Sequence, residues 1–324
     1  MTVTDVPDPS PLEDQYLIQI HAAATNFFDL LQIRGKYQHQ PPLPWISGAE
    51  FAGVVIKAPS KLPYDRTPKF KVGDRVFGSG QGAFADKLAV AEERILPVPE
   101  GWSFFEAAGL FVTAPTSYGA LVHRANVKTG DYVLIHAAAG GVGLAAVQIA
   151  KAYGARVIAT AGTRSKLDTA RRYGADYAID YRQKDWPDQV RSLTPDGRGV
   201  DIVYDPVGLL ALSMKCTAWN GRLLVVGFAG GEIEKLAVNR ILLKNVSVIG
   251  IHWGMYATME PGTVDIVWGG IYDLISQGKF KGTCFTDQEF VGLESVGTAL
   301  KALGARETWG KVVVKIPQGA HSKI

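Results

Sequence analysis

The 324-residue chain is long enough for about two domains, and its 47% hydrophobic and 20% charged residues are typical of a folded globular protein. A net charge of only +3, with no run of Lys and Arg among aromatic residues, argues against a nucleic-acid partner. The two cysteines, Cys216 and Cys284, lie far apart, which excludes a disulfide framework and a Cys-x-x-Cys zinc motif. The chain has no long apolar segment and starts with a polar, proline-rich stretch, so we expect a cytoplasmic protein that does not enter a membrane.

The first hundred residues are expected to be rich in β-strands, because short apolar or alternating runs are separated by proline and glycine. Helices are expected from Phe27 to Gly35 and from Ser103 to His123. The predicted strands cover residues 15–25, 48–58, 74–78 and 84–90.

From about residue 130, apolar strand-like runs alternate with helical runs of 10 to 15 residues. This alternation predicts βαβ units and a doubly wound parallel sheet that is covered on both faces. The expected strands are 131–137, 156–161, 177–180, 200–205, 222–228 and 246–251, and the helices between them are 143–155, 165–175, 184–193 and 209–219. Two later helices, at 263–279 and 294–305, and a strand at 310–316 are expected to return to the first domain. The predicted boundaries are therefore 1–118 and 260–324 for one domain and 119–259 for the other.

A glycine-rich turn lies between the first strand and the first helix of this series. Residues 138–143, AAGGVG, follow the frame of the dinucleotide fingerprint G-x-G-x-x-G, with Ala138 in place of the first glycine. Gly140 would let the backbone approach a pyrophosphate, and Gly143 would let the helix pack closely on the strand. The alternative is a tight turn that binds no ligand.

The end of the next strand predicts which dinucleotide binds. NAD sites carry an acidic residue there for the ribose, whereas this chain has Gly162, Thr163, Arg164, Ser165 and Lys166, and its first acid, Asp168, falls inside the next helix. Two cations and nearby hydroxyl groups suit a 2′-phosphate, so NADPH is the expected cofactor. The alternative is that Arg164 and Lys166 are ordinary solvated residues of a helix terminus.

Several segments together resemble one known family. These are ATNFFDLLQIRGKY, LPWISGAEFAGVV, AAAGGVGLAAVQIAKAYGARVIAT, YDPVG and GRLLVVGFAGG, and they run nearly from end to end of the chain. They resemble the zinc-independent medium-chain dehydrogenase/reductases, and among them the NADPH:quinone oxidoreductases (zeta-crystallin-like). The resemblance implies an α/β fold in which a Rossmann doubly wound sheet is joined to a GroES-like β-barrel domain. Ala49 stands where the zinc-dependent branch has a histidine, so no metal is expected.

The resemblance also assigns roles to particular residues. Asn26 and Tyr37 would face the substrate cleft between the two domains. The residues that the resemblance, together with the end of the second strand, assigns to the cofactor are Thr116, Gly140, Gly141, Val142, Gly143, Gly162, Thr163, Arg164, Lys166, Tyr181, Val207, Gly208 and Phe228.

No His/Asp or Cys/His pair suggests acid–base or nucleophilic catalysis. A quinone that accepts hydride becomes a stabilised oxyanion, for which hydrogen-bond donors suffice, and Asn26 and Tyr37 are the candidate donors. The predicted function is therefore metal-free, NADPH-dependent reduction of a quinone or related conjugated carbonyl. One alternative is a 2-enoyl-thioester reductase, in which Tyr37 of the Gly35-Lys36-Tyr37 segment gives a proton to the α-carbon. A second alternative is an NADPH-binding structural or RNA-binding protein without turnover.

Three other features are expected to be structural. His136 is expected to pack at a strand end, Cys216 to be buried and inert, and Asp201 and Asp205 to mark one strand without forming a carboxylate dyad. The apolar strand at 246–251 is expected at the edge of the sheet, where it would pair with a second copy in a homodimer.

Overall fold

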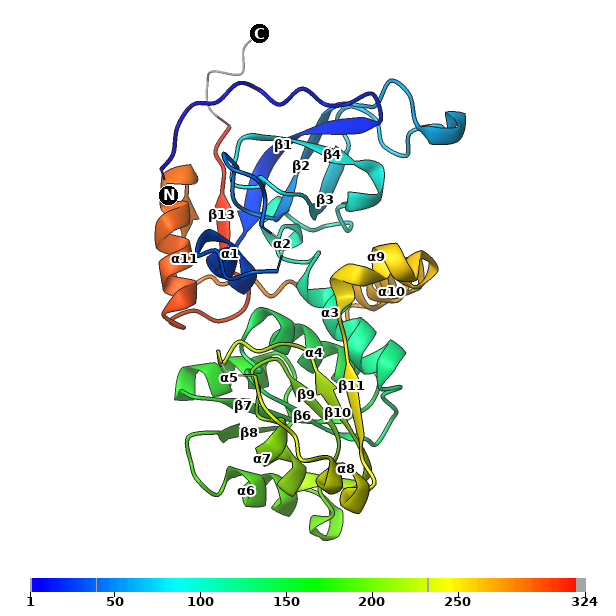
Figure 1. Ribbon diagram of the computed structural model, residues 1–324, viewed down its shortest axis with the longest axis vertical. Coiled ribbons are helices and arrows are strands. Elements are labelled where there is room, and N and C mark those ends of the chain that lie inside the picture. The colour runs from blue at the N-terminus through cyan, green and yellow to red at the C-terminus, as the bar shows by residue number, and fades with distance from the viewer. Residues whose placement is uncertain (1, 39, 232, 319–324) are drawn as a thin grey trace. The chain divides into compact units, whose positions relative to one another are not determined.

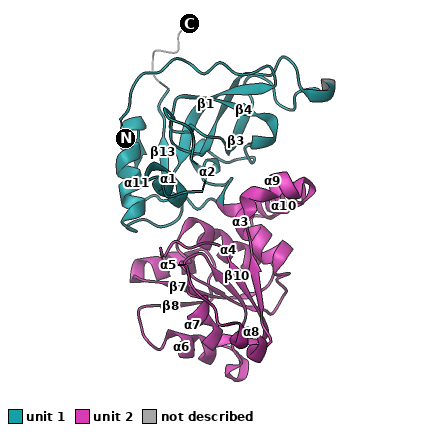
Figure 2. Ribbon diagram, in the orientation of Figure 1, with its two compact units in different colours: residues 1–112, 282–324 teal, residues 113–281 magenta. Residues whose placement is uncertain are grey.

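The computed structural model describes residues 2–38, 40–231 and 233–318, and the chain divides into two compact units. Unit 1 comprises residues 1–112 and 282–324, and unit 2 comprises residues 113–281 (Figure 2). In the described residues, no helix is both long and apolar enough to cross a bilayer.

Unit 1 is built on a seven-stranded sheet in the order β12-β13-β1-β2-β3-β5, with β4 paired to β1. Figure 1 labels β1, β2, β3, β4 and β13 of this sheet. All of its pairs are antiparallel except β12 with β13. The strands are β1 (Gln15–Ala24), β2 (Glu50–Lys57), β3 (Arg75–Ser79), β4 (Lys87–Ala91), β5 (Ile95–Pro97), β12 (Phe290–Val291) and β13 (Val313–Lys315). The helices of unit 1 are α1 (Phe27–Ile33), α2 (Phe104–Ala107) and α11 (Val296–Gly304).

The central strand β1 shows why this sheet forms. Tyr16, Ile18 and Ile20 alternate with half-buried residues, as expected for a strand with one face on a core, and all three are fully buried. They pack with Phe51 of β2 and with Leu300 of α11 in one apolar cluster. The N-terminal and C-terminal parts of the chain therefore share a single core.

Unit 2 is a six-stranded parallel sheet in the order β11-β10-β9-β6-β7-β8, which confirms the predicted doubly wound fold (Figure 1). The strands are β6 (Tyr132–Ile135), β7 (Arg156–Ala161), β8 (Tyr177–Asp180), β9 (Val200–Asp205), β10 (Thr217–Val225) and β11 (Ser247–Gly250). The helices are α3 (Thr113–Tyr118), α4 (Gly141–Ala152), α5 (Arg164–Arg172), α6 (Trp186–Ser192), α7 (Leu210–Ser213), α8 (Val238–Lys244), α9 (Tyr256–Met259) and α10 (Pro261–Ser276). The strand order reverses between β6 and β9, and in open parallel sheets ligands bind at such a point.

Two predicted helices are shorter than expected. The 103–123 helix is broken into α2, α3 and a π-helical turn, because Val112 N donates to the Glu50 carboxylate instead of to a helical carbonyl. The 209–219 helix stops after α7 and a 3₁₀ turn, because Thr217 already pairs with Val200 in the sheet.

The unit boundaries also differ from the expected ones. They fall after residues 112 and 281 instead of after 118 and 259, so α10 belongs to the parallel-sheet unit. Gly270 of α10 lies directly against Tyr118 of α3, where a Cβ would come within 2.1 Å of the phenol oxygen. The Gln148 side chain of α4 also bonds both backbone groups of Lys281. These contacts hold the segment after residue 260 to unit 2.

Candidate active site

Four strand ends of unit 2 form one continuous edge. Because β7, β6, β9 and β10 are parallel neighbours, their carboxyl ends lie side by side. The segments that follow these strands are 162–163, 136–140, 206–209 and 226–231. Six of the thirteen residues predicted to bind the cofactor lie in these segments, and five more lie at the starts of α4 and α5, which follow two of them, so the structure brings these eleven residues to one edge.

The glycine turn between β6 and α4 brings the start of the helix very close to the end of the strand. A Cβ on Gly143 would lie 2.3 Å from Ala137 O, so only glycine allows the helix to start this close to the strand. Gly140 is the N-cap of α4 and has no side chain, which leaves the amides of the first turn facing outward. The left-handed backbone position falls on Ala137, with φ of 45°, which explains why Ala138 can replace the first glycine of the fingerprint.

The end of β7 carries the residues predicted to select the phosphorylated cofactor. Thr163 is the N-cap of α5 and accepts a bond from Lys166 N at 3.4 Å. Arg164 is highly exposed and lies 3.5 Å from Asp168, whose other oxygen bonds Arg171 at 2.8 Å. A Cβ on Gly162 would come within 2.9 Å of the Tyr181 hydroxyl, so this phenol closes over the strand end. The expected cations therefore stand at this edge, and Asp168 lies inside the helix as predicted.

The end of β9 is organised by one buried carboxylate. Asp205 is 1% exposed and accepts hydrogen bonds from Val207 N at 2.8 Å, Gly208 N at 2.9 Å and Leu209 N. Gly208 has φ of 100°, which a residue with a side chain rarely adopts. The carboxylate thus fixes the turn that carries Val207 and Gly208. The prediction that Asp205 is a strand-end residue is confirmed, and its role in holding this turn was missed.

The segment after β10 is fastened to the same turn. Ala229 N donates to Pro206 O at 3.0 Å, and Gly230 N donates to Val207 O at 3.0 Å. Phe228, which is 44% exposed, is thereby held beside Val207 at the rim of the edge.

Helix α3 also contacts this edge, through Ser117. The Ser117 hydroxyl donates to Val142 O at 2.8 Å and bonds the Tyr204 hydroxyl at 2.9 Å. Tyr204 lies opposite Ile135 in the β6–β9 pair. The half-buried Thr116, next to Ser117, is therefore close to the start of α4.

His136, which follows β6, connects this strand to β7 and to helix α7. It is fully buried, with one ring nitrogen 2.9 Å from Thr160 Oγ1 and the other 2.8 Å from Ser213 Oγ. Burial lowers the pKa of His136 to about 4, so the ring is neutral at ordinary pH. The same effect raises the pKa of Cys216 to about 12, which makes this thiol unreactive. The predictions that His136 is packed at a strand end and that Cys216 is buried are confirmed.

Unit 1 contains the two predicted substrate donors, and Asn26 lies in a buried polar cluster. Lys311 Nζ donates to Asn26 Oδ1 and Glu50 Oε2, both at 2.7 Å, and to Thr25 O at 3.0 Å. Asn26 Nδ2 donates to the same Glu50 oxygen at 3.0 Å, and the other Glu50 oxygen accepts from Val112 N at 2.9 Å. Glu50 is fully buried, and Asn26 is 6% exposed.

Asp29 and Tyr37 adjoin this cluster. Asp29, at the third position of α1, accepts from Asn26 N at 2.7 Å, and its buried Oδ1 has no hydrogen-bond partner. Burial raises the pKa of Asp29 to about 7. The ring of Tyr37 stacks on Phe28 with centroids 5.4 Å apart. Burial, helped by the negative charge of Asp29, raises the pKa of Tyr37, so its phenol keeps its proton at neutral pH.

The sequence reasoning missed Lys311, Glu50, Asp29 and Asp205 as functional candidates. Asp205 had a local signal, since an aspartate followed by Pro-Val-Gly at a strand end is typical of a carboxylate that bonds backbone amides a few residues later. Glu50 and Asp29 lie in segments that carried the family resemblance. Lys311 had no such signal, because its partners are 261 to 286 residues away in the chain.

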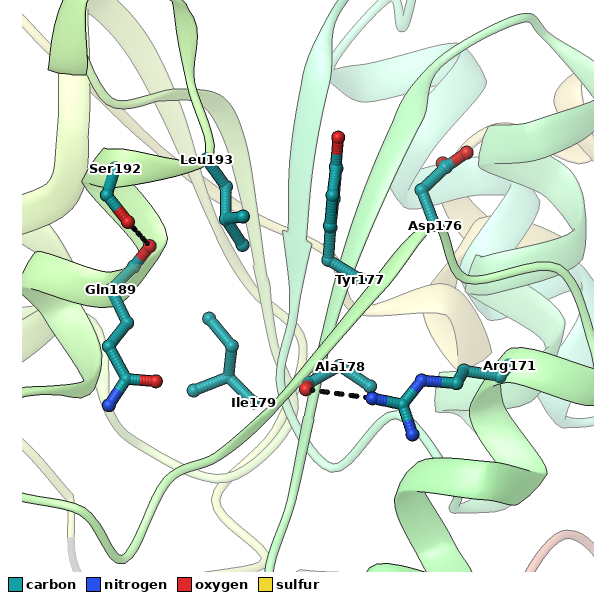
Figure 3. Close-up of a pocket in the computed structure, with 8 residues that line it drawn as sticks. All are labelled: Arg171, Asp176, Tyr177, Ala178, Ile179, Gln189, Ser192 and Leu193. Carbon is teal, nitrogen blue, oxygen red and sulfur yellow. Dashed lines mark hydrogen bonds between the residues drawn. The ribbon is translucent and has the colours of Figure 1, made fainter.

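A pocket elsewhere in unit 2 contains no predicted site residue (Figure 3). It lies along the edge strand β8, where Arg171 donates to Ala178 O at 3.4 Å. Its charged groups are occupied, since Asp176 pairs with Lys151 and Arg171 pairs with Asp168. Within the described ranges, no three His, Cys, Asp or Glu side chains gather in a way that could hold a metal ion.

Comparison with known proteins agrees with both units. Residues 12–100 match the family described as "Alcohol dehydrogenase GroES-like domain", and residues 141–268 match "Zinc-binding dehydrogenase". The quinone oxidoreductase-like protein 2 homolog of Nematostella vectensis is 36% identical over 94% of this chain and 82% of its own length. The chain belongs to the quinone oxidoreductase family of zinc-independent medium-chain dehydrogenase/reductases.

Solved structures of this superfamily share the fold. The Escherichia coli quinone oxidoreductase, crystallised with NADPH, aligns with a TM-score of 0.84 and 28% identity over 96% of this chain and 94% of its own. The CurK enoyl reductase aligns with a TM-score of 0.84 and 26% identity over 97% and 94% of the two chains. The protein is therefore an NAD(P)H-dependent reductase with a small-molecule substrate, and unit 1 is its GroES-like domain.

Proposed function

We propose that this member of the quinone oxidoreductase family uses NADPH to reduce a quinone or a related conjugated carbonyl, without a metal. The edge of unit 2 carries the proposal, because it combines a glycine turn fitted to a pyrophosphate with cations at the start of α5. The names of its relatives, and the NADPH in the Escherichia coli structure, support it.

Each part of the edge is proposed to hold one part of the cofactor. The amides of residues 141–143 would hold the pyrophosphate, and Gly162, Thr163, Arg164, Lys166 and Tyr181 would surround the phosphorylated ribose. Thr116, Val207, Gly208 and Phe228 would line the nicotinamide side. When bound, the nicotinamide supplies the hydride.

Asn26 and Tyr37 are proposed to bind the acceptor. The amide of Asn26 and the phenol of Tyr37 are neutral donors, and donors fixed in place stabilise the negative charge that develops on a reduced carbonyl oxygen. A quinone needs no more from the protein, because the oxyanion formed by hydride transfer takes its one proton from water.

The test is NADPH oxidation against four acceptors: 9,10-phenanthrenequinone, 1,4-benzoquinone, crotonyl-CoA and an alkenal, each with EDTA present. We expect turnover with the quinones that EDTA does not change, together with tighter calorimetric binding of NADPH than of NADH. No heat with NADPH, tighter binding of NADH, or activity lost in EDTA would contradict the proposal.

The second candidate function is reduction of a 2-enoyl thioester. The structural likeness to the CurK enoyl reductase and the proton that Tyr37 retains favour it. Tyr37→Phe separates the two functions, since removing the phenol would abolish crotonyl-CoA reduction if Tyr37 is the proton donor and would leave most of the quinone reduction.

We further propose that two copies pair through β11. This strand ends the sheet, Val248 on it is 37% exposed, and no residue of the neighbouring α8 is buried. Leu242 and Leu243 of α8 are 77% and 72% exposed, which is a large apolar area for a monomer surface. Sedimentation should give the mass of a dimer, and a monomeric mass at micromolar concentration would rule the pairing out.

A further inference from the structure

The Lys311 ammonium is fully satisfied in a dry environment. Its three acceptors are Glu50 Oε2, Asn26 Oδ1 and Thr25 O, and its side chain is 4% exposed. An ammonium has three protons, so each proton has one acceptor. A buried ion pair is often no more stable than well-packed apolar residues, which leaves its presence here to be explained by something other than stability.

The backbone around Lys311 holds the ammonium in one place. Lys311 N donates to Thr283 O and Phe285 N donates to Lys311 O, both at 2.8 Å. A Cβ on Gly109 would lie 2.9 Å from the Cβ of Lys311, so this glycine leaves the space that the lysine side chain fills. The charge is therefore set at a fixed point beside Asn26.

Lys311 and Glu50 bind opposite ends of the Asn26 amide, since one donates a hydrogen bond to it and the other accepts one from it. An amide can turn over so that its oxygen and nitrogen exchange places, and its neighbours decide which arrangement is stable. An ammonium only donates and a carboxylate only accepts. The oxygen must therefore face Lys311 and the nitrogen must face Glu50, as the two distances of 2.7 and 3.0 Å show.

This arrangement leaves one N–H of Asn26 uncommitted. The nitrogen has two hydrogens, and Glu50 takes one of them. Among the described residues, no group accepts the other, while Asn26 remains 6% exposed. Hydrogen bonding of the amide oxygen to an ammonium also polarises the amide and strengthens its N–H as a donor.

We infer that Lys311, together with Glu50, is a positioning residue that makes Asn26 present an N–H, and never its oxygen, to the acceptor oxygen of the substrate. The inference rests on the proposed function. Lys311 itself does not touch the substrate and acts only through Asn26. The site is thereby specific for an acceptor that gains negative charge, and it disfavours a group that must donate a hydrogen bond.

The decisive variants remove the two opposing charges together. Lys311→Met alone would leave Glu50 buried and unpaired, so the test combines Lys311→Met with Glu50→Gln. After Glu50→Gln, the side chain at position 50 can also donate to the amide oxygen of Asn26. The Asn26 amide is then no longer held in one orientation. The matched control is Lys315→Met with Glu289→Gln, which makes the same chemical change in an exposed ion pair.

Steady-state kinetics with NADPH and 9,10-phenanthrenequinone should separate positioning from folding. We expect the 311/50 double variant and Asn26→Ala each to lower kcat by about 10- to 100-fold, with KM for NADPH unchanged. Adding Asn26→Ala to the double variant should change kcat by less than about twofold, because Lys311 acts through Asn26. The control pair should match the wild type. Effects that multiply, or a double variant as fast as the wild type, would overturn the inference.

A measurement on the unmutated enzyme keeps the inference testable if the 311/50 double variant does not fold. The chain has five asparagines, so ¹⁵N-asparagine labelling and Asn26→Ala identify the signals of the Asn26 amide group. Adding NADP⁺ with 4-nitrophenolate as an oxyanion probe should shift one Asn26 proton strongly and leave the proton bonded to Glu50 in place. Equal shifts of both protons, or none, would contradict the assigned orientation. If the wild type oxidises no NADPH with any acceptor, the proposed function fails, while the orientation of the amide is still tested by the positions of these two signals.

Discussion

The two units of this protein build their sites in opposite ways. The edge of unit 2 is made of backbone amides, glycines and exposed side chains, and its one buried acid, Asp205, serves the backbone. The cluster of unit 1 is made of charged and polar side chains that are shielded from water, and Lys311 and Glu50 are almost completely buried. A phosphate ligand brings its own charge and is met by aligned amides. A neutral acceptor that becomes charged only during reaction calls for donors that are already fixed.

The largest expected effect is on the backbone side of this comparison. Gly143→Ala places a Cβ 2.3 Å from Ala137 O, so the start of α4 must shift. We expect NADPH affinity to fall by about 100-fold, since such shifts cost about 1–3 kcal/mol and each tenfold is about 1.4 kcal/mol. Calorimetry measures the change. The control is Gly269→Ala in α10, which has no atom within 4 Å of the added methyl group and should bind normally; equal affinity for both variants would mean that the turn does not hold the cofactor.

Asp205→Ala tests whether a single carboxylate organises the nicotinamide side. Three amides lose a charged acceptor, so the 206–209 turn should loosen. We expect KM for NADPH to rise about tenfold, the equivalent of losing about one hydrogen bond to a charged group. Asp201→Ala is the control, because it removes a carboxylate that bonds Tyr132 N and Arg198 at the other end of β9. A KM that rises equally in both variants would indicate a general loss of stability.

Selection of the phosphorylated cofactor is expected to depend on side chains. In the double variant Arg164→Gln and Lys166→Gln, the preference for NADPH over NADH should fall about tenfold, because two charge-assisted donors are lost. The measurement is the ratio of kcat/KM for the two cofactors. Lys184→Gln, which changes an exposed cation after β8, should leave the ratio as it is. An unchanged ratio in the double variant would place the selecting groups elsewhere.

The smallest expected effect concerns pH and the buried cluster. Burial raises the pKa of Asp29 from 3.8 to about 7, so between these values the folded protein holds a proton that the unfolded chain has released. Stability from this group should therefore decrease as pH rises through that window and stay level above it. The Tm of the wild type should decrease between pH 5 and pH 7.5. We expect this decrease to be about 3 °C smaller in Asp29→Asn, as followed by circular dichroism. A variant with the same slope as the wild type would show that Asp29 is ionised throughout.

Local patterns account for what could be predicted. The alternation of strands and helices gave the parallel sheet, and the turn at residues 138–143 gave the edge, because both depend on residues close together in the chain. The breaks in the 103–123 and 209–219 helices could not be predicted in this way. At both places a long-range partner, Glu50 for Val112 and Val200 for Thr217, takes a backbone group that a local pattern assigns to a helix.

The sequence by itself determined the family, the doubly wound sheet and the position of the glycine turn between strand and helix, since glycine spacing and apolar periodicity are properties of neighbouring residues. The tertiary structure alone decided that Lys311 lies against Asn26, 285 residues earlier in the chain, and that Asn26 is an oriented amide. Hydrogen bonds between buried side chains depend on which strands become neighbours. The packing of the whole core decides which strands become neighbours, so the local sequence around Lys311 does not reveal its partners.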